Sequence, residues 1–200
     1  RPMILAVREL AFAKGRFMLM GAVIALIAVL TVLLSGLATG LVDDGISGLR
    51  ALPVTHLAFQ HGADSTFSRS TVDGESVAAF ERLPGVLAEP FGLTLVNATT
   101  DSDVNVDLAL MGLAEDGFVA AGLLPDGLPP SGAAVVSEGL LGEGVEVGDT
   151  LHIDRSTVSL SIVGVAPKAT YGHVDAVYVP LPVWQEVANL ATEDDPLVAS

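Results

Sequence analysis

Four histidines are the first candidates for chemistry in this 200-residue chain, which has no cysteine. His56 and His61 are five residues apart, a spacing that puts them on opposite faces of a strand, whereas metal ligands must converge. The other two are His152 and His173. Surface or structural roles explain all four best, and the lack of cysteine removes cysteine-zinc and cysteine-haem chemistry. We predict no metal site.

Two pairs of residues have the right chemistry for an axial haem ligand. Tyr171 and His173 share a predicted loop, and tyrosine and histidine both ligate haem iron in proteins. Met18 and Met20 lie at one end of a long apolar segment, and methionine ligates haem iron and packs flexibly against bulky ligands. Loop composition explains the first pair equally well, and lipid or helix packing explains the second. These four residues are weak haem candidates.

The sequence contains no recognisable catalytic motif. A GxxxxGK[ST] phosphate loop is absent, so this chain cannot bind ATP in that manner. No Ser-His-Asp order, paired-acid motif or nucleophile elbow is present, and Ser137 and Glu138 are typical of a helix cap. We therefore expect that this chain is not an enzyme, and we assign it no catalytic residue.

Residues 17–42 contain no Asp, Glu, Lys, Arg or His. As a helix this run is about 39 Å long, which exceeds the roughly 30 Å of a bilayer's hydrocarbon core. A cleaved secretory signal is the alternative, and Gly36, Ala38 and Gly40 resemble a cleavage site, but its apolar region is usually only about 7–15 residues long. The run predicts a transmembrane helix over 17–42, embedded in the lipid bilayer.

Charge predicts the orientation of this helix. Four bases and one acid precede residue 17, whereas five bases and 23 acids follow residue 42, which gives net charges of +3 and −18. Basic residues beside a membrane segment favour the cytoplasmic side. We place residues 1–16 in the cytoplasm, as a short helix over 3–14, and the rest of the chain outside the plasma membrane. The strong acidity argues against nucleic-acid partners, which need basic patches.

Small residues form part of the surface of the predicted membrane helix. Such residues let a second helix approach closely, and two of them are four positions apart. They are Gly21, Ala25, Ala28, Ser35, Gly36 and Gly40. We predict a helix-packing seam there, which a second copy of the chain would share. The alternative is that glycine and alanine are simply frequent in membrane helices.

The remainder of the chain predicts a mixed external domain of the α+β class. Residues 43–53 read as a helical stalk that Pro53 ends, and 54–200 as the domain. Strands are predicted at 54–60, 91–97, 104–111, 133–137, 150–154, 157–165 and 176–181, and helices at 75–83, 138–142 and 182–191. Glycine and proline are frequent over 117–132, which is typical of a loop or a boundary between lobes. One division into two lobes is 54–116 with 166–200, and 117–165.

Three segments carry a resemblance to a known family. They are AVVSEGLLGEGVEVGDTL at 134–151, LSIVGVAP at 160–167 and AVYVPLPVWQEV at 176–187. In this order they resemble the external domain of ABC-transporter permeases of the MacB/FtsX type, with its "vGD" turn, "vvGv" strand and "vyvPl" before a helix. Residues 8–41 look most like the haem-exporter-type permeases of actinobacteria.

The resemblance implies a MacB-like periplasmic core domain and a role in transport. Permeases of this type look like four membrane helices with the external domain between the first and second, so we expect this chain to be part of a longer one. It implies two permease copies and a separate ATPase subunit that binds ATP and Mg²⁺. The expected function is efflux of a hydrophobic compound, with haem as one candidate, driven mechanically through the external domain.

Two other functions remain open from the sequence. The chain could be a single-span anchor for an external module that binds a protein, a lipid or a wall component without transport. It could also belong to relatives of the same family that use ATP-driven motion to release lipoproteins or control cell-wall hydrolases. Substrate contacts cannot be read from residues 1–200, so the sequence does not separate these functions from export.

Overall fold

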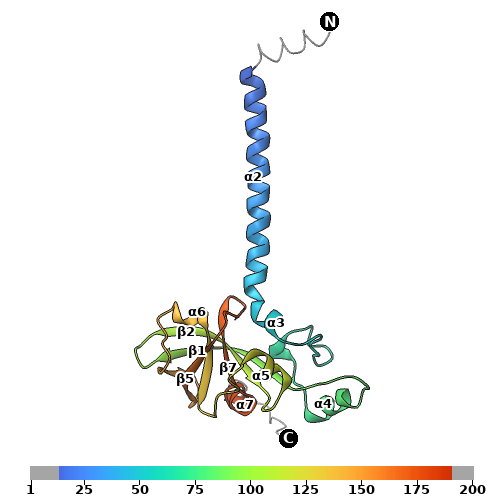
Figure 1. Cartoon of the computed structure of the whole chain (residues 1–200), viewed down its shortest axis with the longest axis vertical. Coiled ribbons are helices and arrows are strands. Elements are labelled where there is room, and N and C mark those ends of the chain that lie inside the picture. The colour runs from blue at the N-terminus through green and yellow to red at the C-terminus, as the bar shows by residue number, and fades with distance from the viewer. Residues whose placement is uncertain (1–13, 191–200) are drawn as a thin grey trace. The chain divides into compact units, whose positions relative to one another are not determined.

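The computed structural model describes residues 14–190, without the side chains of residues 43, 44, 189 and 190. It divides into an N-terminal unit that ends at Asp43 and a compact domain that begins at Asp44. Figure 1 shows the elements of both units. The predicted cytoplasmic helix over 3–14 falls, except for its last residue, outside the described residues.

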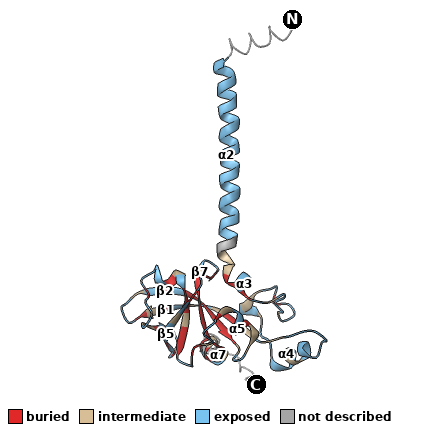
Figure 2. Ribbon diagram, viewed as in Figure 1, coloured by how far each residue is buried: buried red, intermediate tan, exposed pale blue. Residues whose placement is uncertain are grey.

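The N-terminal unit consists of the long helix α2 (Lys14–Gly45), whose last residues belong to the domain. Every residue from 14 to 42 is exposed, including the apolar ones, as Figure 2 shows. Thr31 and Thr39 return their hydroxyl hydrogens to the carbonyl oxygens of Ile27 and Ser35, one turn earlier, at 2.8 and 3.0 Å. This pairing hides both hydroxyls from an apolar surrounding. By length and composition, α2 is long and apolar enough to cross a membrane over Lys14–Val42.

The domain is built on one seven-stranded sheet in the order β2-β1-β4-β5-β3-β7-β6. The strands are β1 (Phe91–Thr100), β2 (Asn105–Leu113), β3 (Ala133–Ser137), β4 (Thr150–Ile153), β5 (Ser159–Ala166), β6 (Thr170–Tyr171) and β7 (Val174–Pro180). β2 also pairs in parallel with β7, from Leu108 opposite Asp175 to Leu113 opposite Pro180. The sheet therefore closes on itself into a ring of six strands, with the short β6 beside β7.

Short helices and one 3-10 helix surround this ring. They are α3 (Ser47–Ala51), the 3-10 helix η1 (Phe67–Arg69), α4 (Gly74–Glu81), α5 (Phe118–Leu123), α6 (Glu138–Leu141) and α7 (Leu181–Leu190). The chain thus has one N-terminal apolar helix followed by a domain of mixed strands and helices, as its sequence predicts.

Two apolar clusters fill the two sides of the strands. All six strands of the ring contribute to the inner cluster, together with residues of α6 and α7. The outer cluster lies on the other face of β1, β2 and β7, under α3 and α5. Even-numbered residues of β2, such as Leu108 and Leu110, belong to the inner cluster, and the odd-numbered Ala109 and Met111 belong to the outer one. β2 is therefore buried on both faces.

Most predicted elements are confirmed, and three predictions are wrong. Residues 54–60 form no strand: Gln60 is tied to Ser70 and Thr71 through side chains instead of a backbone ladder. The glycine-rich stretch 117–132 contains the helix α5, and the loop predicted around Tyr171 and His173 contains β6. Strands on both sides of the predicted lobe boundary share the one sheet. The division into lobes stays a prediction.

α5 forms because a residue far away in the sequence caps it. The Glu89 carboxylate accepts hydrogen bonds from the backbone N–H groups of Phe118 and Val119, at 2.7 and 3.1 Å. These are two of the donors that the first turn of a helix leaves unpaired. A side chain at Gly117 would collide with this carboxylate, since a Cβ there would lie 2.6 Å from the Glu89 Oε2 atom.

The only tryptophan of the chain, Trp184, lies against a pair of glycines on neighbouring strands. Gly92 of β1 is opposite Gly112 of β2, and a Cβ on either would overlap Trp184, at 2.5 Å from its Cβ in the case of Gly112. The two glycines thus form a flat seat that lets α7 approach the ring closely.

We predict that Gly112→Ala lowers the free energy of unfolding of the full chain by about 1–3 kcal/mol, because it overpacks this seat. Urea unfolding in detergent measures it, with the fluorescence of Trp184 as the signal. The matched control is Gly164→Ala in β5, where a new Cβ would lie 3.4 Å from the nearest Val135 methyl, an ordinary contact. An equal loss of unfolding free energy in both variants would contradict the close packing of Trp184 against Gly112.

Candidate functional site

The chain enters the domain through a short segment that is hydrogen-bonded to the hairpin of β6 and β7. The backbone N–H of Gly172 donates to the carbonyl oxygen of Gly45 at 2.9 Å. The Ser47 hydroxyl accepts from the Thr170 N–H at 2.9 Å and lies 2.8 Å from the Thr170 hydroxyl. We call Gly45, Ser47, Gly48, Thr170 and Gly172 the joint. The first three lie within residues 43–53, predicted as a helical stalk, which contain the end of α2 and the helix α3.

Close packing holds the joint as well as hydrogen bonds. A Cβ on Gly48 would lie 2.9 Å from the Thr170 carbonyl oxygen and 3.0 Å from the end of the Met111 side chain, so only glycine fits there. Leu52, four residues later, is buried in the outer cluster. The segment is therefore anchored at both ends of α3.

The β6–β7 turn has a backbone that its residue types only partly favour. Gly172 and His173 both have positive φ, at 61° and 71°, as in the type I′ turns of tight hairpins. Glycine adopts this conformation freely, whereas histidine does so less often. The His173 ring lies beside Gly45, because a Cβ on that glycine would be 3.3 Å from the ring's Cε1 atom. The turn thus presses on the backbone of the joint.

A buried pair continues this connection into the ring. The Ser137 hydroxyl, at the end of β3, donates to the Asp175 carboxyl in β7 at 2.7 Å. It also accepts from the Ala169 N–H at 3.0 Å, one residue before the joint residue Thr170. Both Ser137 and Asp175 are buried. A Cβ on Gly139 would overlap the Asp175 carboxyl, so this corner admits no larger residue.

The joint and the Ser137–Asp175 pair can pass a displacement from residues 45–52 to the strands of the ring. Each connection is a short hydrogen bond or a tight contact, and several are buried, where an unpaired polar group is costly. Movement of the chain segment must therefore move the β6–β7 hairpin with it. The arrangement suits mechanical coupling of that segment to the ring.

We predict that Ser137→Ala destabilises the full chain by about 1–3 kcal/mol, because it leaves the buried Asp175 carboxyl and the Ala169 N–H without their shared partner. Urea unfolding followed by Trp184 fluorescence measures this loss. Ser156→Ala is the control, since the Ser156 hydroxyl accepts from Val158 within its own half-buried turn. A loss no larger than that of the control would mean that the buried pair does not hold the corner together.

The four haem candidates lie in two different units. Met18 and Met20 are exposed on α2, whereas Tyr171 and His173 belong to the β6–β7 hairpin. The Tyr171 ring packs edge-on against Phe67, with 5.7 Å between the ring centroids, so packing explains its position. The haem assignment stays a prediction.

The remaining histidines have local roles or are exposed. His152 lies 2.7 Å from the Asp101 carboxylate and 2.9 Å from the Ser159 hydroxyl. The hydrogen bond from His152, with a further one from Thr150, holds the pKa of Asp101 below its ordinary value. His56 and His61 are exposed, outside any strand. Within residues 14–190 no three His, Asp or Glu side chains are grouped to hold a metal ion.

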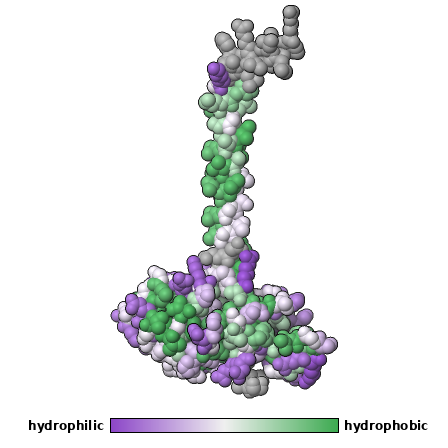
Figure 3. Space-filling model, in the orientation of Figure 1, coloured by the Kyte–Doolittle hydropathy of each residue, from purple (hydrophilic) through white to green (hydrophobic). Residues whose placement is uncertain are grey.

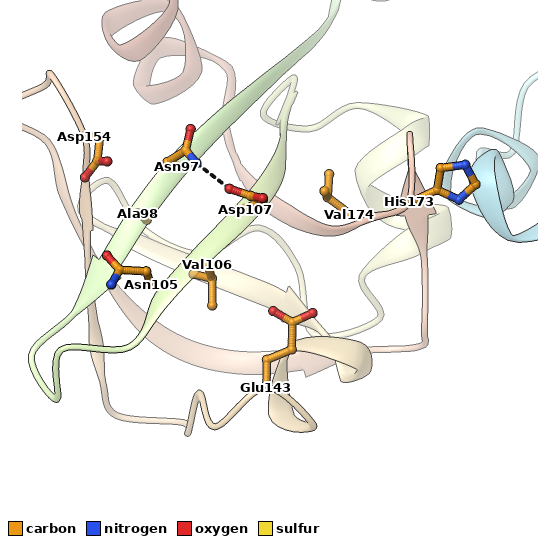
Figure 4. A pocket seen from close by; sticks show the side chains of 9 residues that line it. All are labelled: Asn97, Ala98, Asn105, Val106, Asp107, Glu143, Asp154, His173 and Val174. Atoms are coloured by element: carbon orange, nitrogen blue, oxygen red, sulfur yellow. Dashed lines mark hydrogen bonds between the residues drawn. The ribbon is translucent and has the colours of Figure 1, made fainter.

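One open cavity of about 390 Å³ lies beside the β6–β7 hairpin. Figure 4 shows its lining, with Asn97 hydrogen-bonded to Asp107 across β1 and β2 and with His173 at one edge. Glu143 and Asp154 make the rim more acidic. These carboxylates would attract a cation weakly, but they do not converge on one point as ligands must.

The residues of the predicted helix-packing seam are all exposed on α2. No heavy atom lies within 4 Å of a Cβ built on Gly21, Gly36 or Gly40. The space that a partner helix would fill is therefore open at these glycines, and the seam stays a prediction.

The sequence does not reveal the joint. Ser137 was recognisable as a helix cap, and it does accept from the Gly139 N–H at 3.3 Å. Its bond to Asp175 and the bond between Ser47 and Thr170 join residues that are far apart in the chain, so no local pattern could have indicated them.

No family model matches the sequence, and no curated protein matches it. Among solved structures, one similar chain is a domain of a protein described as a permease from Porphyromonas gingivalis, at 20% identity and a TM-score of 0.41, covering 55% of this chain and 53% of that one. Another is the extracellular domain of the noncanonic ABC-type transporter YknZ from Gram-positive bacteria, at 14% identity and a TM-score of 0.35, covering 56% and 64%. The chain thus spans about half to two thirds of the chains that it matches. Both TM-scores lie below 0.5.

Proposed function

We propose that this chain is the first membrane helix and the extracytoplasmic domain of an ABC-type permease subunit of the MacB/FtsX type. A separate ATPase subunit would bind ATP and Mg²⁺, and its movement would reach the domain through the membrane helices. The joint is the observation that carries the proposal, because it fixes the segment after α2 to the ring. A domain that receives force needs such a fixed connection.

The residues that carry the family resemblance support the proposal through their structural roles. Gly148, in the "vGD" turn before β4, has a φ of +104°, which only glycine adopts readily. Gly164 lies in β5 beside the shift of register between Ala134 and Val135. Pro180 ends β7, and Pro182 is the second residue of α7, where proline suits a first turn.

The substrate and the assembly follow from the resemblance. The complex would contain two permease copies and two ATPase subunits, and it would export a hydrophobic compound from the membrane, with haem as one candidate. Residues 21–40 of α2 would line the seam between the two permease copies. This role requires no enzymatic group in the chain itself.

The proposed orientation gives the first test, and the lack of cysteine makes it direct. Ser102→Cys, in the exposed turn after β1, should react with a membrane-impermeant maleimide on intact cells. Ala6→Cys, on the basic side of the apolar segment, should react only after the membrane is permeabilised. Labelling of Ala6→Cys in intact cells, or protection of Ser102→Cys, would overturn the orientation.

The coupling role is tested in the full complex with its ATPase, reconstituted in nanodiscs. We expect hydrolysis of ATP to be stimulated by the transported compound, tested as haem, a macrolide and a peptide. Gly48→Val should abolish the stimulation and keep the basal rate, because it forces the joint apart. If the chain binds no ATPase subunit, the result would favour the single-span binding module instead.

A second variant separates coupling from misfolding. Ser47→Cys with Thr170→Cys should form a disulfide on oxidation, since the two native hydroxyl oxygens are 2.8 Å apart. Because the joint already moves as one body, the cross-linked complex should keep its stimulated hydrolysis of ATP. Loss of stimulation on cross-linking, with recovery on reduction, would show that the joint must open and would contradict rigid coupling.

A further inference from the structure

Helix α4 and the turn after it present an apolar surface that serves neither core. The surface, which we call the apolar ridge, consists of Val77, Phe80, Leu83, Val86 and Leu87. No residue of α4 is buried, and none of the five belongs to either apolar cluster. Leu87 is 82% exposed, more than any large apolar residue of α2.

The ridge has a fixed shape. The Asp73 carboxylate caps α4 by accepting from the Ser76 N–H at 2.8 Å. The chain then turns at Pro84 and Gly85, where the Val86 N–H donates to the Leu83 carbonyl oxygen at 3.3 Å and Gly85 has a φ of +78°. Proline and a positive-φ glycine at these positions are typical of a type II turn. A surface held in this way loses little conformational freedom on binding.

Exposed apolar residues gathered at one place generally mark an interaction site in a soluble domain. Single exposed leucines are common, but here four exposed apolar side chains and the half-buried Val77 fall within eleven residues of sequence, from 77 to 87. Figure 1 places α4 at the periphery of the domain, and Figure 3 shows hydrophobic and strongly hydrophilic surface side by side there. Folding alone does not explain the ridge.

Charge indicates what covers the ridge. Asp73, Glu75 and Glu81 are exposed along it, against the single base Arg82. The hydrogen bond from Ser76 lowers the pKa of Asp73 below its ordinary value. The chain after residue 42 is strongly acidic, with a net charge of −18. An anionic lipid surface and a second acidic copy would both be repelled, whereas a basic partner would be attracted.

We propose that the apolar ridge docks an amphipathic helix with basic flanks, supplied by another extracytoplasmic protein. The apolar face of the helix would cover Phe80, Leu83 and Leu87, and its lysine or arginine residues would pair with the carboxylates around them. This inference goes beyond the proposed transport function, and it holds whether or not the chain belongs to a pump.

The experiment uses the full chain in nanodiscs of zwitterionic phosphatidylcholine, with empty nanodiscs as the blank. The probe is a labelled amphipathic peptide of leucine and lysine, compared with a leucine and glutamate peptide of equal length and hydrophobicity. Fluorescence anisotropy should show binding of the basic peptide and little binding of the acidic one. Leu87→Asp should weaken binding of the basic peptide about tenfold or more, as loss of a central apolar contact does.

The matched control is Val163→Asp, on β5 and 52% exposed, outside the ridge. Both variants add one negative charge, so non-specific attraction of a basic peptide would rise equally in the two. Unchanged binding by Val163→Asp together with weak binding by Leu87→Asp supports the proposal. Equal affinity for the two peptides, or equal behaviour of the two variants, overturns it.

Two further readouts identify a different occupant. An environment-sensitive dye on Leu87→Cys should report a watery surrounding in nanodiscs without peptide and an apolar one after the basic peptide is added. An apolar signal without peptide would assign the ridge to the bilayer. Self-association of the wild-type chain that Leu87→Asp abolishes would assign it to a second copy. Either result overturns the proposal.

Discussion

The buried hydroxyl of Ser137 is the contact on which the rest of the domain depends. It connects the end of β3, the segment before β6 and the start of β7, three parts of the chain that meet only in the folded state. The joint continues from the same place, since Thr170 follows Ala169 directly and pairs with Ser47. The buried hydroxyl oxygen of Ser137 therefore links the segment that follows α2 to the strands that form the ring. The partners of this hydroxyl are shielded from water. A partner that loses its hydrogen bond to the hydroxyl therefore cannot bond to water instead, and leaving it unpaired costs free energy.

The acidic surface lowers the stability of the folded domain, and the strands that are buried on both faces raise it. A net charge of −18 after residue 42 opposes a compact state through repulsion. The ring compensates by burying β2 and β7 on both faces, so that a short chain without disulfides has two apolar clusters. The apolar ridge stands outside this balance, because its side chains belong to neither apolar cluster.

Patterns in the sequence predicted the features that depend on interactions between neighbouring residues. The strands predicted at β1 and β2 and the Ser137 cap of α6 all depend on neighbours within a few residues. Residues 54–60 alternate as a strand does, yet they remain without a partner strand in the closed ring. α5 depends on the distant Glu89, and the joint depends on contacts across more than a hundred residues. The α+β class was therefore predictable, whereas the coupling site was not.

The closure of the ring has a consequence for biogenesis. Leu108 and Asp175, which begin the pairing of β2 with β7, are 67 residues apart in the sequence. Synthesis begins at the N-terminus and delivers β2 long before β7, so β2 waits with one edge unpaired. That edge is apolar on both sides and prone to aggregate. The time that β7 takes to arrive therefore decides how long an aggregation-prone edge stays open.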